Sequence, residues 1–154
     1  MDNRPPHKYA PAALPEGGLF RLMVLGLLNA ERQCLVIPGM QHGDPMSMGA
    51  RTGNLIASSR IYGTHAHTGE RAKDAAEAAD LVFDHVTTLL GEGGADWSNL
   101  TQLTAFIGEA EFRGLIEERW QARTAGLASS PRLNVLVPTL AGGPNPRVEI
   151  LALL

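Results

Sequence analysis

The chain has 154 residues, which suit one compact domain with a hydrophobic core and leave little room for a second domain. It carries 13 basic and 16 acidic residues and a formal net charge of -3, so the composition offers no attraction for nucleic acid or an anionic membrane surface and favours a small-molecule or protein partner. Cys34 is the only cysteine, so the chain cannot form an internal disulfide, which is typical of a cytoplasmic protein.

Residues 1–30 are predicted to form an N-terminal extension, partly flexible, and residues 31–154 a single domain. Residues 1–18 are rich in Pro and Ala, and residues 19–30 are predicted as a short helix or an extra strand. The apolar run in this segment is interrupted by Arg21 and is shorter than the roughly 20 residues that a membrane span needs. We therefore expect neither a signal peptide nor a membrane anchor.

The first half of the predicted domain contains two strands and one long helix. Residues 32–37 are predicted as a strand, residues 41–53 as a loop because Gly, Pro, Asp and Ser dominate them, and residues 54–62 as a second strand. Apolar residues then recur at helical spacing over residues 70–90 and stop before Gly91. This spacing predicts one amphipathic helix that packs against a sheet.

The second half adds three strands and a second helix. Residues 100–107 are predicted as a strand and residues 109–124 as the helix. The last two segments, 133–137 and 148–154, flank a turn-rich stretch and are predicted to pair as a hairpin. The order β-β-α-β-α-β-β predicts an α+β fold, with two helices on one face of a mixed sheet and a different cover on the other face.

Two charged residues on the last two predicted strands are the strongest candidates for a functional site. Arg132 follows Pro131 and offers a planar fork of donors that can hold a small carboxylate. Glu149 lies in an otherwise apolar strand, where a buried carboxylate costs free energy unless it is paired, hydrated or used. A simple hairpin could point the two side chains to opposite faces unless a bulge intervenes. Together they predict a site for a small carboxylate-bearing molecule.

The same residues carry a resemblance to a known family. The sequence PRLNV at 131–135, followed by VEILA at 148–152, resembles the C-terminal signature of the RidA family, also called YjgF or UK114. The segments GNLIASS at 53–59, TGE at 68–70 and LTAFI at 103–107 resemble three further motifs of the family. All lie in family order, and the resemblance spans roughly residues 35–154.

This resemblance implies a chorismate-mutase-like (RidA-type) fold, a homotrimer and substrate clefts between subunits. In the family, the arginine that matches Arg132 binds the substrate carboxylate, and the glutamate that matches Glu149 orients or activates water. The implied reaction is hydrolysis of a reactive enamine or imine, such as 2-aminoacrylate or 2-iminobutanoate, to a 2-keto acid and ammonia. We therefore predict Arg132 and Glu149 as catalytic residues, and a substrate-binding set of Arg132, Asn134, Arg60, Ser59 and His42.

Several positions depart from the family pattern. Arg60 stands where the family usually has glycine, and Asn134 where members often have cysteine. Ile116 replaces a common asparagine, and Leu151 replaces a second acidic residue. His65-Ala66 replaces an Asp-Pro pair before the TGE segment. These departures indicate a specialised subgroup, with a larger enamine such as 2-aminomuconate as one substrate and Arg60 as a contact for its second carboxylate.

Other functions stay open at this point. The chain could be a non-catalytic trimeric module that binds small carboxylates or a protein, or a pathway enzyme that uses the cleft for tautomerisation or cyclisation. The sequence contains no glycine motif for dinucleotides or phosphates and no Cys-x-x-Cys. His65 and His67 have no further ligand at a suitable spacing, so we expect neither a metal nor a cofactor.

Overall fold

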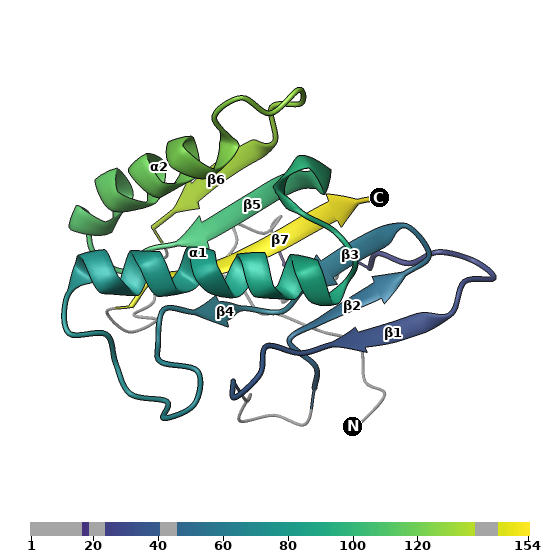
Figure 1. Cartoon of the computed structure of the whole chain (residues 1–154), viewed down its shortest axis with the longest axis horizontal. Helices are drawn as coiled ribbons and strands as arrows, with labels where there is room; N and C mark the ends of the chain where they lie inside the picture. The colour runs from purple at the N-terminus through teal and green to yellow at the C-terminus, as the bar shows by residue number, and fades with distance from the viewer. Residues whose placement is uncertain (1–16, 19–23, 41–45, 138–144) are drawn as a thin grey trace.

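The computed structural model describes residues 17–18, 24–40, 46–137 and 145–154 (Figure 1). Its regular elements are two long helices, one short 3-10 helix and the strands of one sheet. In chain order they are β1 (Arg32–Leu35), β2 (Gly49–Thr52), β3 (Leu55–Ser58), β4 (Ile61–Tyr62), α1 (Ala75–Glu92), η1 (Trp97–Asn99), β5 (Leu100–Phe106), α2 (Glu111–Thr124), β6 (Arg132–Leu136) and β7 (Arg147–Leu153).

The strands form one mixed sheet in the order β1-β2-β3-β7-β5-β6, and the short β4 also pairs with β7. The β5 and β6 pair is parallel, whereas the other pairs are antiparallel. Both α1 and α2 lie on the same face of this sheet (Figure 1). The predicted α+β class, with two helices on one face of a mixed sheet, is therefore confirmed.

The predicted C-terminal hairpin is wrong. β6 pairs in parallel with β5, and β7 lies between β3 and β5 in the sheet. β7 has buried Val148, Ile150 and Ala152, so it takes a central place with neighbours on both sides, whereas β6 borders the sheet. Sequence neighbours often pair, but here the burial of the more apolar strand decides the order.

The segment between the first two predicted strands also differs from expectation. β2 lies inside the predicted loop and pairs with both β1 and β3. The predicted strand 54–62 is interrupted at Ser59 and Arg60, between β3 and β4. At this interruption, the backbone N–H and the hydroxyl of Ser59 both donate to the carbonyl oxygen of Met48, at 2.8 and 2.9 Å. Ser59 therefore fixes the chain where it leaves β3.

Helix α1 begins five residues later than predicted because Asp74 caps it. The Asp74 side chain accepts a hydrogen bond from the backbone N–H of Glu77 at 2.8 Å. The Glu77 carboxylate in turn accepts from the backbone N–H of Lys73 at 2.6 Å. The first of these bonds satisfies an amide group that the first turn of a helix leaves without a partner, and the second ties the residue before the cap to that turn. No helix among the described residues combines the length and apolar character of a membrane span.

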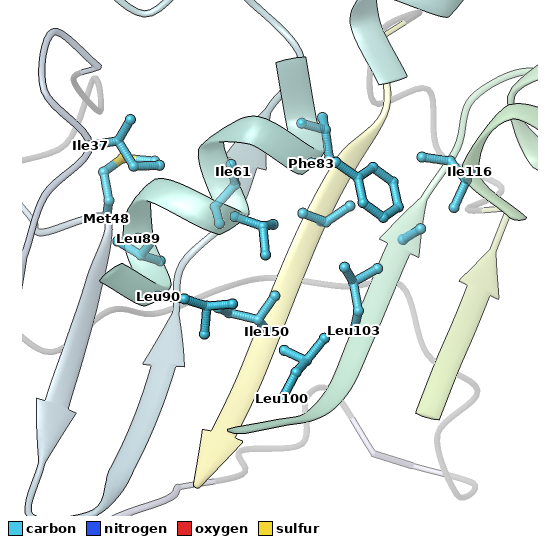
Figure 2. Close-up of a cluster of buried hydrophobic side chains, with 14 of the residues drawn as sticks. Ile37, Met48, Ile61, Phe83, Leu89, Leu90, Leu100, Leu103, Ile116 and Ile150 are labelled. Atoms are coloured by element: carbon cyan, nitrogen blue, oxygen red, sulfur yellow. The ribbon is translucent and has the colours of Figure 1, made fainter. Parts of the chain in front are cut away.

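The hydrophobic core lies between the helices and the sheet (Figure 2). From α1, Phe83 and Leu90 point toward the sheet, where Leu103 and Ile150 meet them, and Ile116 contributes from α2. All five side chains are almost completely buried. The core therefore occupies one face of the sheet and leaves the opposite face, which we call the open face, for other contacts.

Candidate functional site on the open face

The register of the sheet places Glu149 on the open face. Side chains alternate along a strand, and Val148 and Ile150 belong to the core, so Glu149 between them points away from the helices. Glu149 pairs with Thr104 of β5, and Thr104 pairs with Asn134 of β6. These three side chains form one row across the open face.

The alternation of side chains also places Arg132 on the open face. Arg132 and Glu149 therefore do not point to opposite faces, as a simple hairpin could have required. Arg132 pairs with Gln102, which pairs with Leu151 on β7, whereas the neighbouring Leu133 packs against the core. Arg132 and Glu149 therefore share a face. They are separated by β5 and by two positions along the strands, which corresponds to about 12 Å between Cα atoms. Arg132 is exposed in the single chain.

Among the described residues, Arg60 is a cation in direct contact with Glu149. Its Nε atom lies 3.3 Å from Oε1 of Glu149. The Glu149 side chain is only 6% exposed and that of Arg60 is 21% exposed, so the pair is largely shielded from water. The Arg60 guanidinium also lies over the ring of Phe106, 4.6 Å from its centroid, in a cation–π contact. Arg60 is thus held between a carboxylate and an aromatic face.

A second arginine flanks the same carboxylate. Arg147 lies two positions before Glu149 on β7, pairs with Phe106 on one side and with Tyr62 on the other, and so shares the open face. Its guanidinium lies over the Tyr62 ring, 5.2 Å from the centroid. Among the described residues, the buried Nε atom of Arg147 has no hydrogen-bond partner. A buried donor of this kind costs free energy until an acceptor reaches the guanidinium group.

Two amides surround the hydroxyl of Thr104 in the middle of the row. Nδ2 of Asn134 lies 3.4 Å and Nε2 of Gln102 lies 3.1 Å from Oγ1 of Thr104. All three side chains are half-buried. They supply neutral donors and acceptors between Glu149 and the β6 strand that carries Arg132.

The two remaining predicted site residues are Ser59 and His42. Ser59 is 1% exposed and its hydroxyl donates to the Met48 carbonyl, so it supports the bend that presents Arg60. His42 lies outside the described residues. Its assignment to the substrate site stays a prediction.

No group of three or more potential metal ligands occurs among the residues that the structure describes. Nε2 of His65 lies 3.8 Å from Oε1 of Glu77 near the start of α1. His67 lies close to Gly39, where an added Cβ would collide with the imidazole ring of His67. The two histidines thus belong to the packing around the segment that leads into α1.

Sequence reasoning missed Phe106, Arg147 and Tyr62 as parts of this site. The alternation within 100–107 already predicts that Phe106 faces away from Leu103 and Ala105, and it is the signal that could have found this residue. The contacts of Arg147 and Tyr62 depend on the pairing of β4 with β7, which joins segments far apart in the chain. Local patterns contain no such information.

Chemically, the open face combines three kinds of group. A shielded carboxylate can accept a proton from water, guanidinium groups can hold an anionic ligand by charge-assisted hydrogen bonds, and an aromatic ring gives the ligand an apolar wall. The arrangement suits a small anionic molecule.

Comparison with known proteins places this geometry in a known fold. No protein-family model and no curated protein sequence matches the chain. Among solved structures, the YjgF gene product of E. coli superimposes with a TM-score of 0.68 at 18% identity, over 79% of this chain and 98% of that one. E. coli TdcF with bound serine matches with a TM-score of 0.70 at 18% identity, over 79% and 98% of the two chains.

RidA from the Antarctic bacterium Psychrobacter matches with a TM-score of 0.69 at 15% identity, over 79% of this chain and 99% of that one. The chain therefore has the fold of the RidA and YjgF proteins. The resemblance that the sequence motifs indicate is confirmed at the level of the fold.

Proposed function

We propose that this chain, which has the RidA fold, is a divergent member of the RidA family and hydrolyses a small reactive enamine or imine acid to a 2-keto acid and ammonia. The observation that carries the proposal is the placement of Arg132 and Glu149 on one face of the sheet. Among the described residues, Glu149 is the one acidic side chain that is buried. It occupies this position in the segment that carries the family signature.

The reaction divides its proton transfers between water and Glu149. The enamine first takes a proton on carbon and becomes the electrophilic iminium ion, which is the protonated imine. Glu149 accepts a proton as water adds to the imine carbon, which forms a C–O bond and a carbinolamine. Glu149 then passes this proton to nitrogen, the C–N bond breaks and ammonia leaves, and the hydroxyl proton returns to Glu149 as the C–O bond becomes a carbonyl. Arg132 holds the substrate carboxylate and so keeps the imine carbon within reach of the water.

The separation of Arg132 and Glu149 suits a ligand between them. Their Cα atoms lie about 12 Å apart across the sheet, so the two side chains can approach a small acid from opposite sides. Arg132 is exposed in the single chain, so a ligand or a neighbouring subunit can reach its guanidinium group. E. coli TdcF, which shares this fold, binds serine, a molecule with one small carboxylate.

The same proposal includes a homotrimer. The open face carries an apolar patch formed by neighbouring residues of β2, β3 and β7: Ala50, Leu55, Ala57, Leu151 and Leu153. Leu153, at the end of β7 and paired with Leu55, is 48% exposed in the single chain, which is a large exposure for an apolar side chain. Association through this face would bury the patch and place the charged group beside a subunit boundary.

Release of ammonia and 2-keto acid from 2-iminobutanoate tests the proposal. The imine is made in place by an amino-acid oxidase, and semicarbazide traps whatever the protein has not yet hydrolysed. We expect the wild-type chain to shorten the lifetime of the imine and Arg132→Ala to lose most of that effect. Equal trapping with wild type and with buffer would overturn the proposed reaction.

One observation favours a second function, a module that binds small carboxylates without turnover. The carboxylate expected to activate water is already in contact with Arg60. A binding module would lose affinity when Arg132 is replaced and would have no turnover to lose. The trapping assay separates the two functions because only an enzyme changes the lifetime of the imine.

A further inference from the structure

The charge of the open face is opposite in sign to the net charge of the chain. The whole chain carries a formal net charge of -3. The described part of the open face from Arg60 to β6 carries three arginines and one carboxylate: Arg60, Arg132, Arg147 and Glu149. This excess of positive charge is concentrated around one shielded carboxylate. A ligand with a single negative charge would neutralise only part of this excess of positive charge.

Two of these arginines lie on the same side of Glu149, away from Arg132. Arg60 contacts Glu149 directly and lies over Phe106, while Arg147 pairs with Phe106 and lies over Tyr62. Both guanidinium groups are therefore oriented by aromatic rings before any ligand arrives. Fixed, planar donors of this kind recognise a carboxylate more selectively than a flexible lysine does.

The contact between Arg60 and Glu149 is long for an ion pair. Its N···O distance of 3.3 Å compares with 2.7 Å between Arg119 and Asp80 and 2.6 Å between Arg123 and Asp84 in the same chain. Charge-assisted hydrogen bonds are usually about 2.7–2.9 Å long. A second carboxylate that takes the place of Glu149 on Arg60 preserves the charge pairing at the usual distance of such bonds.

We propose that Arg60 and Arg147 form a second carboxylate subsite, so that this site takes short dicarboxylic 2-imino or 2-keto acids in preference to monocarboxylic ones. Arg132 holds the carboxylate next to the imine carbon, and the distal carboxylate moves Arg60 off Glu149. Glu149 is then available to accept the proton from water. The catalytic part of this inference rests on the proposed function, whereas the binding preference does not.

Two keto acids of equal chain length test the subsite by isothermal titration calorimetry. The first, 2-oxoglutarate, carries a distal carboxylate, and the second, 2-oxopentanoate, carries a methyl group in its place. We expect the wild type to bind 2-oxoglutarate at least about tenfold more tightly, which is the effect of one charge-assisted contact. We expect Arg60→Ala to reduce this ratio to near one and Arg60→Lys to keep part of it.

Arg113→Ala is the matched control, because it removes an exposed arginine of α2 whose partner is Glu117. Its ratio of dissociation constants should equal that of the wild type. Equal binding of the two acids by the wild type, a preference that survives in Arg60→Ala, or no binding of 2-oxoglutarate would each overturn the inference. The wild-type ratio alone decides the matter if Arg60→Ala does not fold.

Turnover is measured separately, on 2-iminoglutarate and on 2-iminopentanoate with semicarbazide trapping. If the wild type prefers 2-oxoglutarate but hydrolyses neither imine, the proposed deamination is wrong and the subsite stands. If it hydrolyses both imines equally and binds both keto acids equally, the deamination stands and the subsite is wrong.

Discussion

The Nε atom of Arg60 lies 3.3 Å from Oε1 of Glu149, although 89 residues separate them in the chain. The bend after β3 presents the arginine, and β7 presents the glutamate from its central position in the sheet. Arg60 stands where the resembled family usually has glycine, so this contact distinguishes the chain from the family pattern. The proposed second subsite predicts that a distal carboxylate of the ligand displaces Glu149 from Arg60.

Replacement of Arg132 tests the assignment of the first carboxylate. We expect Arg132→Ala to lower kcat/KM for imine hydrolysis by roughly 10- to 150-fold, because a charged hydrogen bond contributes about 1.5–3 kcal/mol. Arg132→Lys should retain part of the activity, since it keeps the charge and loses the planar fork. Unchanged kcat/KM in Arg132→Ala, with Arg113→Ala as the control for loss of an arginine, would exclude Arg132 from the site.

The motif residues and the helices could be predicted from the sequence because their signals are local. Glu149 is conspicuous within one apolar strand, and α1 follows from one spacing of apolar residues. β2 could not be predicted, since Gly49–Thr52 has a loop-like sequence and becomes a strand only by pairing with β1 and β3. The place of β7 between β3 and β5 could not be predicted either, because it also depends on pairing between distant segments.

This difference explains which part of the site was missed. Arg132 and Glu149 were identified by residue type and motif, but their common face depends on β5 lying between them. The contact of Arg60 with Glu149 depends on strand pairings between distant segments. The predicted C-terminal hairpin does not include Arg60, so it contains no information about this contact. Residue types predict the chemistry, and the sheet order decides which residues meet.

The apolar patch on the open face predicts association between chains, and the resemblance to the RidA family implies a trimer. We expect light scattering to give a mass of three chains of 16.4 kDa each. Leu55 and Leu153 are paired neighbours in this patch, and the double variant Leu55→Asp, Leu153→Asp should dissociate the assembly because two like charges cannot be buried together. Gln121→Asp, on the exposed side of α2, should leave the mass unchanged. A monomeric wild type would contradict the prediction.

Because His85 is buried, we expect the protein to lose stability in mild acid. His85 is 7% exposed, and its Nδ1 atom lies 3.0 Å from the carbonyl oxygen of Tyr62. Burial lowers the pKa of His85 below its ordinary value of 6.5, and this effect exceeds the opposing ones of the Tyr62 hydrogen bond and of Asp84. As the pH falls below the unfolded pKa, the unfolded chain binds a proton that the folded chain does not, so stability decreases until the pH reaches the folded pKa.

The free energy of unfolding, measured in urea at about pH 7.5 and about pH 5.5, checks this expectation because histidine titrates in this range. The loss from His85 is about 1.4 kcal/mol for each pH unit between its folded and unfolded pKa values. His85→Gln, whose amide can still donate to the Tyr62 carbonyl, should lose less stability than the wild type over the same range. An identical loss in both proteins would assign the acid sensitivity to other groups.

The ion pairs between the two long helices are expected to contribute little. Arg123 of α2 lies 2.6 Å from Asp84 of α1, and the aspartate side chain is 63% exposed. We expect Asp84→Asn to lower the free energy of unfolding by about 0.2–1 kcal/mol, and by less in high salt, because water and ions screen exposed charges. Chemical denaturation at two salt concentrations measures the effect. A loss of several kcal/mol that does not depend on salt would contradict this account.

The most direct test of the central claim compares turnover and binding in Glu149→Gln. We expect the rate of imine hydrolysis to fall by about 10²- to 10⁴-fold, because the amide cannot accept the proton of water. We also expect 2-oxoglutarate to bind at least as tightly as to the wild type, because the variant removes the negative charge that competes for Arg60. Retained hydrolysis in Glu149→Gln would contradict the role of Glu149 and with it the proposed site.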